Sequence, residues 1–154
     1  MTCFSPSFLA CTCVFLAMLS PGCTEYQRPT EMVMSSGVQY LAQGQHVLAA
    51  EEFQIVTERW PGEWEAQLAL GQCYLEMDRL TDARSSLTNA IANRPVSEDI
   101  ADALAEVYFR EGSTQHLFVF LRERTTGYSS VHSWLRLATY SIKCNDPDLA
   151  RSAV

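Results

Sequence analysis

Charged residues are missing from the first 24 positions, because the 11 basic and 18 acidic residues all lie at or after Glu25. Only one of the basic residues is a lysine, and no basic stripe occurs along the chain. Together with a formal net charge of -7, this argues against a general nucleic-acid-binding protein. No stretch reaches the roughly 18 to 20 apolar residues that a membrane-spanning helix needs. The composition excludes a spanning helix and favours a globular domain.

Motifs of catalysis and of metal binding are also missing. His46, His116 and His132 form no His-Glu-x-x-His pair and have no metal-ligand spacing with cysteine or aspartate. The chain has neither a phosphate-binding glycine loop nor a Gly-x-Ser-x-Gly nucleophile elbow. Adjacent acids such as Glu51 and Glu52 indicate a solvated helix face. We therefore expect no enzymatic activity and no metal or cofactor.

Cysteine is scarce outside the first 23 residues. Four of the six cysteines lie in that leader, and only Cys73 and Cys144 remain in the body of the chain. The two are far apart in sequence, and no spacing rule pairs them. We expect Cys73 to act as a small buried apolar residue.

The leader itself has an apolar run from Phe8 to Leu19, which fits the hydrophobic region of a secretory signal. The run is followed by Ser20, Pro21, Gly22 and Cys23. This ending resembles that of a bacterial lipoprotein signal. The resemblance implies that Cys23 becomes the lipidated first residue of the mature protein and that residues 24–29 form a tether. An ordinary cleaved signal and a retained apolar helix stay open. No basic residue precedes the run, and Ser20 and Pro21 replace the family's usual residues.

An internal repeat of 34 residues organises the rest of the chain. Small, aromatic, large apolar and proline positions recur at this one offset, which indicates a repeat architecture. The matched pairs are Gly37 and Gly71, Tyr40 and Tyr74, Ala49 and Ala83, Phe53 and Leu87, and Pro61 and Pro95.

This pattern resembles the tetratricopeptide repeat, a helix-turn-helix unit of 34 residues. The resemblance implies an all-α, right-handed superhelical solenoid of antiparallel helix pairs, with about three to four units. We place the units at residues 30–63, 64–97, 98–130 and, in part, 131–154. The small residues allow the two helices of a unit to cross closely, and the large ones fill the adjacent space. Gly44 suits the turn of the first unit, whereas Asp78 is a less comfortable residue at the same place.

The third and fourth units fit the pattern less completely. In the third, Ala105 takes the glycine position, but Leu117 stands where alanine is expected. We expect its second helix over residues 114–124, packed further from its partner, and then a loop in which Gly127 caps the helix. The fourth unit places Trp134, Leu137 and Ala138 in a first helix. Asp146, Pro147 and Ala150 would then begin the second helix.

In tetratricopeptide arrays, the first helices line a groove that holds a peptide or a helix of a partner. The resemblance therefore assigns groove positions in each unit, which would be apolar at the start of the array and acidic in the middle. Such a surface suits an apolar segment with basic flanks. An alternative is that the next repeat or the tether covers some of these apolar residues. The groove residues are Glu31, Met34, Val38, Leu41, Ala42, Glu65, Leu68, Gln72, Leu75, Glu76, Asp99, Asp102, Glu106, Phe109, Arg110, His132, Leu135, Thr139, Ile142 and Lys143.

The sequence thus predicts a non-catalytic scaffold for protein assembly. The leader adds the expectation of a lipoprotein anchored in the bacterial cell envelope, which contacts the membrane only through its lipid. Secretion and a cytoplasmic location, the latter with Met32 or Met34 as the true start, are the alternatives for location. The alternative function is that the chain forms the N-terminal repeat region of a longer enzyme or sensor, or a cytosolic adaptor.

Overall fold

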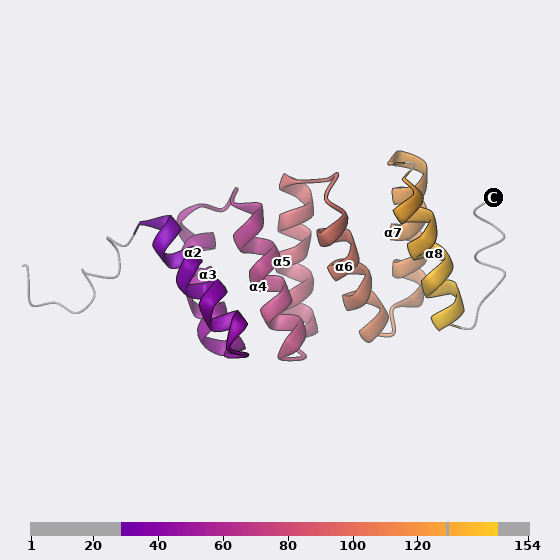
Figure 1. Ribbon diagram of the computed structural model, residues 1–154. Coiled ribbons are helices and arrows are strands. Elements are labelled where there is room, and N and C mark those ends of the chain that lie inside the picture. The colour runs from indigo at the N-terminus through magenta and orange to yellow at the C-terminus, as the bar shows by residue number, and fades with distance from the viewer. Residues whose placement is uncertain (1–28, 129, 145–154) are drawn as a thin grey trace, which may run out of the picture.

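The computed structural model describes residues 29–128 and 130–144, and this part of the chain forms seven helices and no strand. The helices run alternately up and down and stack side by side in chain order (Figure 1). The predicted all-α solenoid of antiparallel helix pairs is therefore confirmed. The leader with Cys23, the tether apart from Pro29, and Asp146, Pro147 and Ala150 lie outside the described residues. The helices are α2 (Thr30–Ala42), α3 (His46–Arg59), α4 (Trp64–Glu76), α5 (Leu80–Asn93), α6 (Glu98–Arg110), α7 (Thr114–Gly127) and α8 (Val131–Lys143).

The turn inside each of the three complete helix pairs has the same backbone geometry. Gly44, Asp78 and Gly112 all have positive φ, at 70°, 57° and 69°. The amide of each donates to a carbonyl three residues earlier in the preceding helix. A left-handed residue at this place lets the chain leave the helix and reverse. Asp78 is the one L-residue among the three, and it adopts a conformation that glycine tolerates better.

The crossing of the two helices in the first and second units depends on glycine. A Cβ atom on Gly37 would lie 2.6 Å from Cε1 of Phe53, and one on Gly71 would lie 2.6 Å from Cγ of Leu87. Both distances are below any normal carbon–carbon contact. The large side chain of the second helix therefore occupies the space where a side chain on the first helix would stand. This confirms the predicted pairing of small and large residues at the crossings.

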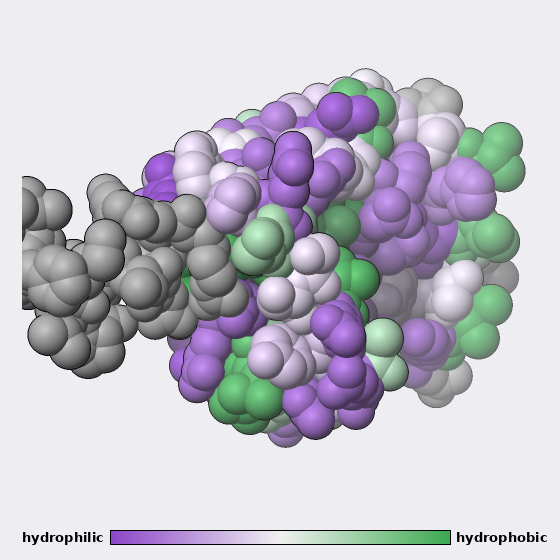
Figure 2. Space-filling model, turned by 60° about the vertical axis from the view of Figure 1, so that its left-hand side comes forward, coloured by the Kyte–Doolittle hydropathy of each residue, from purple (hydrophilic) through white to green (hydrophobic). Residues whose placement is uncertain are grey.

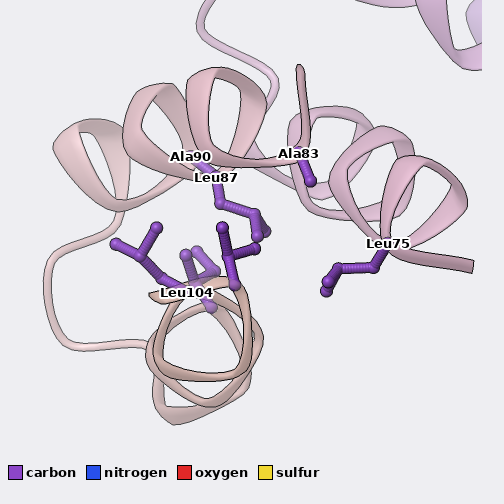
Figure 3. Packing of buried hydrophobic residues seen from close by; sticks show 7 residues of the cluster. Leu75, Ala83, Leu87, Ala90 and Leu104 are labelled. Carbon is purple, nitrogen blue, oxygen red and sulfur yellow. The ribbon is translucent and has the colours of Figure 1, made fainter. Parts of the chain in front are cut away.

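A core cluster joins the second unit to the first helix of the third. Leu75, Leu87 and Leu104 come from α4, α5 and α6 and point into the space that these helices share (Figure 3). Ala83 and Ala90 lie on the facing side of α5, and both are fully buried. The alanines keep α5 close to its neighbours, and the leucines fill the interior between units. Each unit thus shares its apolar core with the next, as in solenoids generally.

The third helix pair is more open than the first two. The backbones of α6 and α7 approach each other less closely than those of α4 and α5. Leu117 is fully buried at the position that carries alanine in the earlier units. A larger side chain at this contact separates the two helices, as predicted.

The end of α7 differs from our prediction. The helix continues through Gly127, and Tyr128 is the residue that caps it. Gly127 does not have the positive φ of a capping glycine. The extension has a tertiary cause, because Arg124 is 5% exposed and donates hydrogen bonds to the carbonyls of Pro95 and Ser97. These contacts hold the last turn of α7 on the loop between α5 and α6.

Candidate functional site: the groove face

The groove face is the surface where the first helices of successive units, α2, α4, α6 and α8, carry the predicted groove residues. Helices α4 and α6 are in direct contact, as are α6 and α8. Side chains at groove positions cross these contacts. Arg110 of α6 donates to the carbonyl of Leu75 of α4 at 3.1 Å, and Tyr140 of α8 donates to a carboxylate of Glu106 of α6 at 3.1 Å. The groove positions of neighbouring units therefore belong to one continuous surface.

The apolar groove residues of the first two units are unequally accessible. Val38 is 56% exposed, whereas Met34, Leu41 and Leu68 are half-buried against the core. Leu75 is only 6% exposed, because it belongs to the core cluster with α5 and α6. The next repeat covers this residue, which was one of our two interpretations. Leu75 supports the groove but does not reach a ligand.

Carboxylates stand free on the first half of the groove face. Glu65, Glu76 and Asp99 are exposed, and no ion pair among the described residues includes them. Gln72, between the two glutamates on α4, is also exposed. Because nothing in the described chain neutralises these carboxylates, they attract a positively charged ligand.

The second half of the groove face contains an open hollow of about 250 Å³ between α6 and α8. Five of its seven lining residues are groove positions assigned from the sequence. Arg136 and Tyr140 also line it, and neither was predicted as a groove residue. The lining residues are Asp102, His132, Leu135, Arg136, Thr139, Tyr140 and Lys143.

Glu106 is the centre of a polar network beside this hollow. It accepts a hydrogen bond from Nε of Arg110 at 3.0 Å and one from the Tyr140 hydroxyl at 3.1 Å. The ammonium of Lys143 lies 3.7 Å from the same carboxylate. Burial by itself would raise the pKa of Glu106, but the hydrogen bonds and the two nearby cations outweigh it, so the pKa lies below its usual value. Glu106 is therefore ionised and already bound within the protein.

A second network fixes α8 on α6. Arg136 is 6% exposed, and it forms ion pairs with Asp102 and, at 2.9 Å, with Glu98. Burial acts to lower the pKa of Arg136, and the two carboxylates raise it above its usual value. Ser130 completes the network by donating to Glu98 at 2.8 Å. The predicted acidic middle of the groove is thus largely neutralised by the chain's own arginines.

Aromatic rings flank the lysine of this region. The rings of Phe109 and Tyr140 lie 5.6 Å apart, and the Lys143 ammonium lies 5.2 Å from the first ring centre and 4.8 Å from the second. Such contacts hold a cation in place without removing it from solvent. Burial and the charge of Glu106 together raise the pKa of the Tyr140 hydroxyl, so it remains a hydrogen-bond donor. The arrangement is polar, and the exposed apolar residue Leu135 lines the same hollow.

The described residues were also searched for groups that could bind a metal, react as a nucleophile or cross a membrane. No group of three or more His, Cys, Asp or Glu side chains among them is placed to hold a metal ion. Burial raises the pKa of the Cys73 thiol to about 11, so this thiol is protonated and unreactive near neutral pH. None of the described helices combines the length and the apolarity needed to cross a membrane.

Arg136 was missed from the sequence although signals for it exist. Arg136 occupies the place that holds Ser35, Ala69 and Ala103 in the other units. A long cation in place of a small residue indicates a contact specific to this unit. The pair of Asp102 and Arg136 is also separated by one repeat length, so the two face each other across neighbouring first helices.

Comparison with known proteins agrees with the geometry. Residues 40–109 match the family model of the tetratricopeptide repeat. Over these residues the chain is similar to tetratricopeptide repeats. The match covers the second half of the first unit, the whole second unit and the first helix of the third. No curated protein sequence matches the chain.

Two solved structures resemble the array as a whole. One is MamA, with a TM-score of 0.68 and 19% sequence identity, over 80% of this chain and 73% of that chain. The other is a thermophilic tetratricopeptide protein of Thermus thermophilus, with a TM-score of 0.64 and 18% identity, over 84% of this chain and 73% of that chain. At these identities, the resemblance establishes the fold alone. The kind of partner has to be inferred from the residues of the groove face.

Proposed function

We propose that this protein is a non-catalytic scaffold that holds a segment of a partner protein along the groove face. The observation that carries the proposal is the continuous surface formed where the first helices meet, with a hollow at the contact between α6 and α8. Exposed apolar residues such as Val38 and Leu135 alternate there with free charges. A surface of this kind suits an extended or helical segment with apolar anchors.

We compared the groove face with other parts of the surface as a place for a partner to dock. Hydrophilic residues cover most of the face seen in Figure 2, and the hydrophobic ones form separate small patches. Single exposed apolar residues are normal on a soluble protein and need no partner. The second helices α3, α5 and α7 expose mainly polar residues, together with the apolar Val47, Leu48 and Val119. The groove face differs from the second helices in its hollow between α6 and α8 and in its carboxylates without ion pairs, so we favour it as the docking surface.

The partner segment should carry basic residues. The free carboxylates on the groove face are Glu65 and Glu76 of α4 and Asp99 of α6, whereas Asp102 and Glu106 are occupied by arginine and lysine. The basic residues of the partner are therefore expected over the second unit. This narrows the prediction made from the sequence, which assigned the acidic character to the middle of the array.

Charge reversal on α4 tests this proposal. A displayed library of short peptides is selected on the unmodified protein, and the affinity of the best peptides is measured for variants. We expect Glu65→Lys with Glu76→Lys to weaken binding about three- to thirtyfold, since each exposed pair contributes about 0.2 to 1 kcal/mol and reversal adds repulsion. Glu106 is not a suitable target, because its change would disrupt the bonds to Arg110 and Tyr140.

The matched control makes the same change of charge elsewhere. Glu51→Lys with Glu123→Lys alters two exposed carboxylates on the second helices α3 and α7. These variants should bind the peptides with unchanged affinity. If both pairs of variants weaken binding equally, the effect reflects net charge alone, and the groove face is not the docking surface.

We further propose that the scaffold works in the bacterial cell envelope, held at the membrane by a lipid on Cys23. The support is the apolar run from Phe8 to Leu19 and the small residues before Cys23. Mass spectrometry of the mature N-terminus tests this proposal. A diacylglycerol-modified Cys23 is the expected result, and an intact Met1 or a start at Met32 would contradict it.

A further inference from the structure

The sign of charge changes from one end of the groove face to the other. Helices α2 and α4 carry only acidic charges, namely Glu31, Glu65 and Glu76. Helix α8 carries only basic charges, in Arg136 and Lys143, and it also holds His132. Helix α6 lies between them and carries both signs. The first helices thus form a surface that is negative at one end and positive at the other.

Glu98 and Asp102 neutralise Arg136, so the positive end depends on Lys143. Glu106 is shared by Arg110 and Lys143, so one positive charge is in excess at this carboxylate. The Lys143 side chain is 44% exposed. An ammonium group has three donors, and an approach at 3.7 Å to Glu106 leaves others for a ligand. His132 on the same hollow is exposed and adds a further donor.

The negative end is likewise available. Glu65 and Glu76 are exposed, and among the described residues neither takes part in an ion pair. Packed helices lie about 8 to 10 Å apart, so α4 and α8, with α6 between them, are separated by about 20 Å. An extended chain covers this distance in about six residues. One short segment can therefore contact both ends of the groove face.

We infer that the groove face takes a bipolar segment, whose basic end lies over Glu65 and Glu76 and whose acidic end lies at the hollow beside Lys143 and His132. This inference rests on the proposed function and adds the direction of the bound segment. The complementary charges at both ends favour one orientation and oppose the reverse one. Apolar residues in the middle of the segment would contact Leu68 and Leu135 on either side of α6.

Synthetic peptides of about ten residues test the inference, because they span the distance between α4 and α8. One peptide has a basic end, an apolar middle and an acidic end, and the other has the same middle and two basic ends. A photoreactive residue beside one end of each peptide reports its position after cross-linking and mass spectrometry. We expect the bipolar peptide to bind about three- to tenfold tighter at low salt, with its acidic end cross-linked to α8.

Two variants sharpen the result. Lys143→Glu should abolish or reverse the preference for the bipolar peptide, because it removes the excess positive charge at the hollow. Arg122→Glu makes the same change on the exposed face of α7 and should leave the preference intact. Circular dichroism of both variants checks that the helices persist.

The outcomes separate the two proposals. Equal or tighter binding of the dibasic peptide, or cross-links from the acidic end to α2 or α4, would overturn the bipolar inference and leave the groove face as a docking surface. If neither peptide binds or cross-links to the groove face, both the inference and the proposed function are overturned.

Discussion

The contact between the first and second units differs in kind from the contact between the third and fourth. The first consists of apolar side chains, with Phe53 of α3 buried against Leu70 and Cys73 of α4. The second adds a buried arginine, Arg136 of α8, which forms ion pairs with Glu98 and Asp102 of α6, to its apolar residues. Similar helix pairs are thus joined by apolar packing at the first contact and by apolar packing together with buried ion pairs at the second.

The difference has consequences for stability. Apolar packing does not depend on salt or on the protonation of any group. A buried guanidinium is stable only while its carboxylate partners are charged, and loss of one partner leaves an uncompensated buried charge. Glu98 serves Arg136 at 2.9 Å and lies 4.0 Å from Arg124. The contact between the third and fourth units should therefore respond to conditions that leave the first two units unchanged.

The largest effect is expected from Leu117→Ala in α7. The substitution leaves a cavity where a fully buried leucine stood, in the pair whose helices are already further apart. We expect destabilisation of about 2 to 5 kcal/mol, measured by urea unfolding. A loss under about 1 kcal/mol would show that α7 closes onto α6, and that Leu117 does not set their separation.

A smaller effect is expected from the reciprocal change, Ala83→Leu in α5. Ala83 is fully buried at the equivalent position of the second unit, where α4 and α5 are close. The added atoms overpack this contact, and we expect destabilisation of about 1 to 3 kcal/mol by the same measurement. An unchanged midpoint of unfolding would contradict the assigned close contact. Thr88→Leu, at an exposed position of α5, controls for the added apolar side chain.

Much of the fold could be predicted because small and large residues recur at fixed positions of the repeat. Gly37 and Gly71 precede Phe53 and Leu87 by a fixed interval, and the structure shows the contacts that this interval predicts. The end of α7 could not be predicted in this way. Gly127 has the local character of a cap, but contacts between Arg124 and the loop of the preceding unit extend the helix. Tertiary contacts of this kind override local preference.

The positions of the groove residues remain a prediction, whereas their charge state depends on contacts that the sequence does not reveal. Five of the twenty groove positions assigned by resemblance line the hollow, among them His132, Leu135 and Thr139. The sequence does not reveal which carboxylates are already paired. Asp102 is bound by an arginine from the next unit, and such pairing depends on side-chain geometry across two helices.

The pH dependence of the charged contact follows from its glutamates. Burial acts to raise the pKa of Glu98, but hydrogen bonds from Arg136 and Ser130 and the charges of both arginines outweigh it, so the pKa lies below its usual value. The pKa of Glu106 also lies below its usual value, because its hydrogen bonds and nearby cations outweigh the effect of burial. A group with a depressed pKa in the folded state adds stability above its unfolded pKa, and this stability is lost as the pH falls through the folded value. Acid should therefore weaken the second half of the array first.

Hydrogen exchange tests this claim most directly, with protection factors measured along the chain at about pH 7 and about pH 3.5. We predict that α7 and α8 lose protection at the lower pH while α4 and α5 keep theirs, and that Glu98→Gln produces the same pattern at neutral pH. If both halves lose protection together, or if α4 and α5 lose it first, the two contacts are not held by different forces and the account is contradicted.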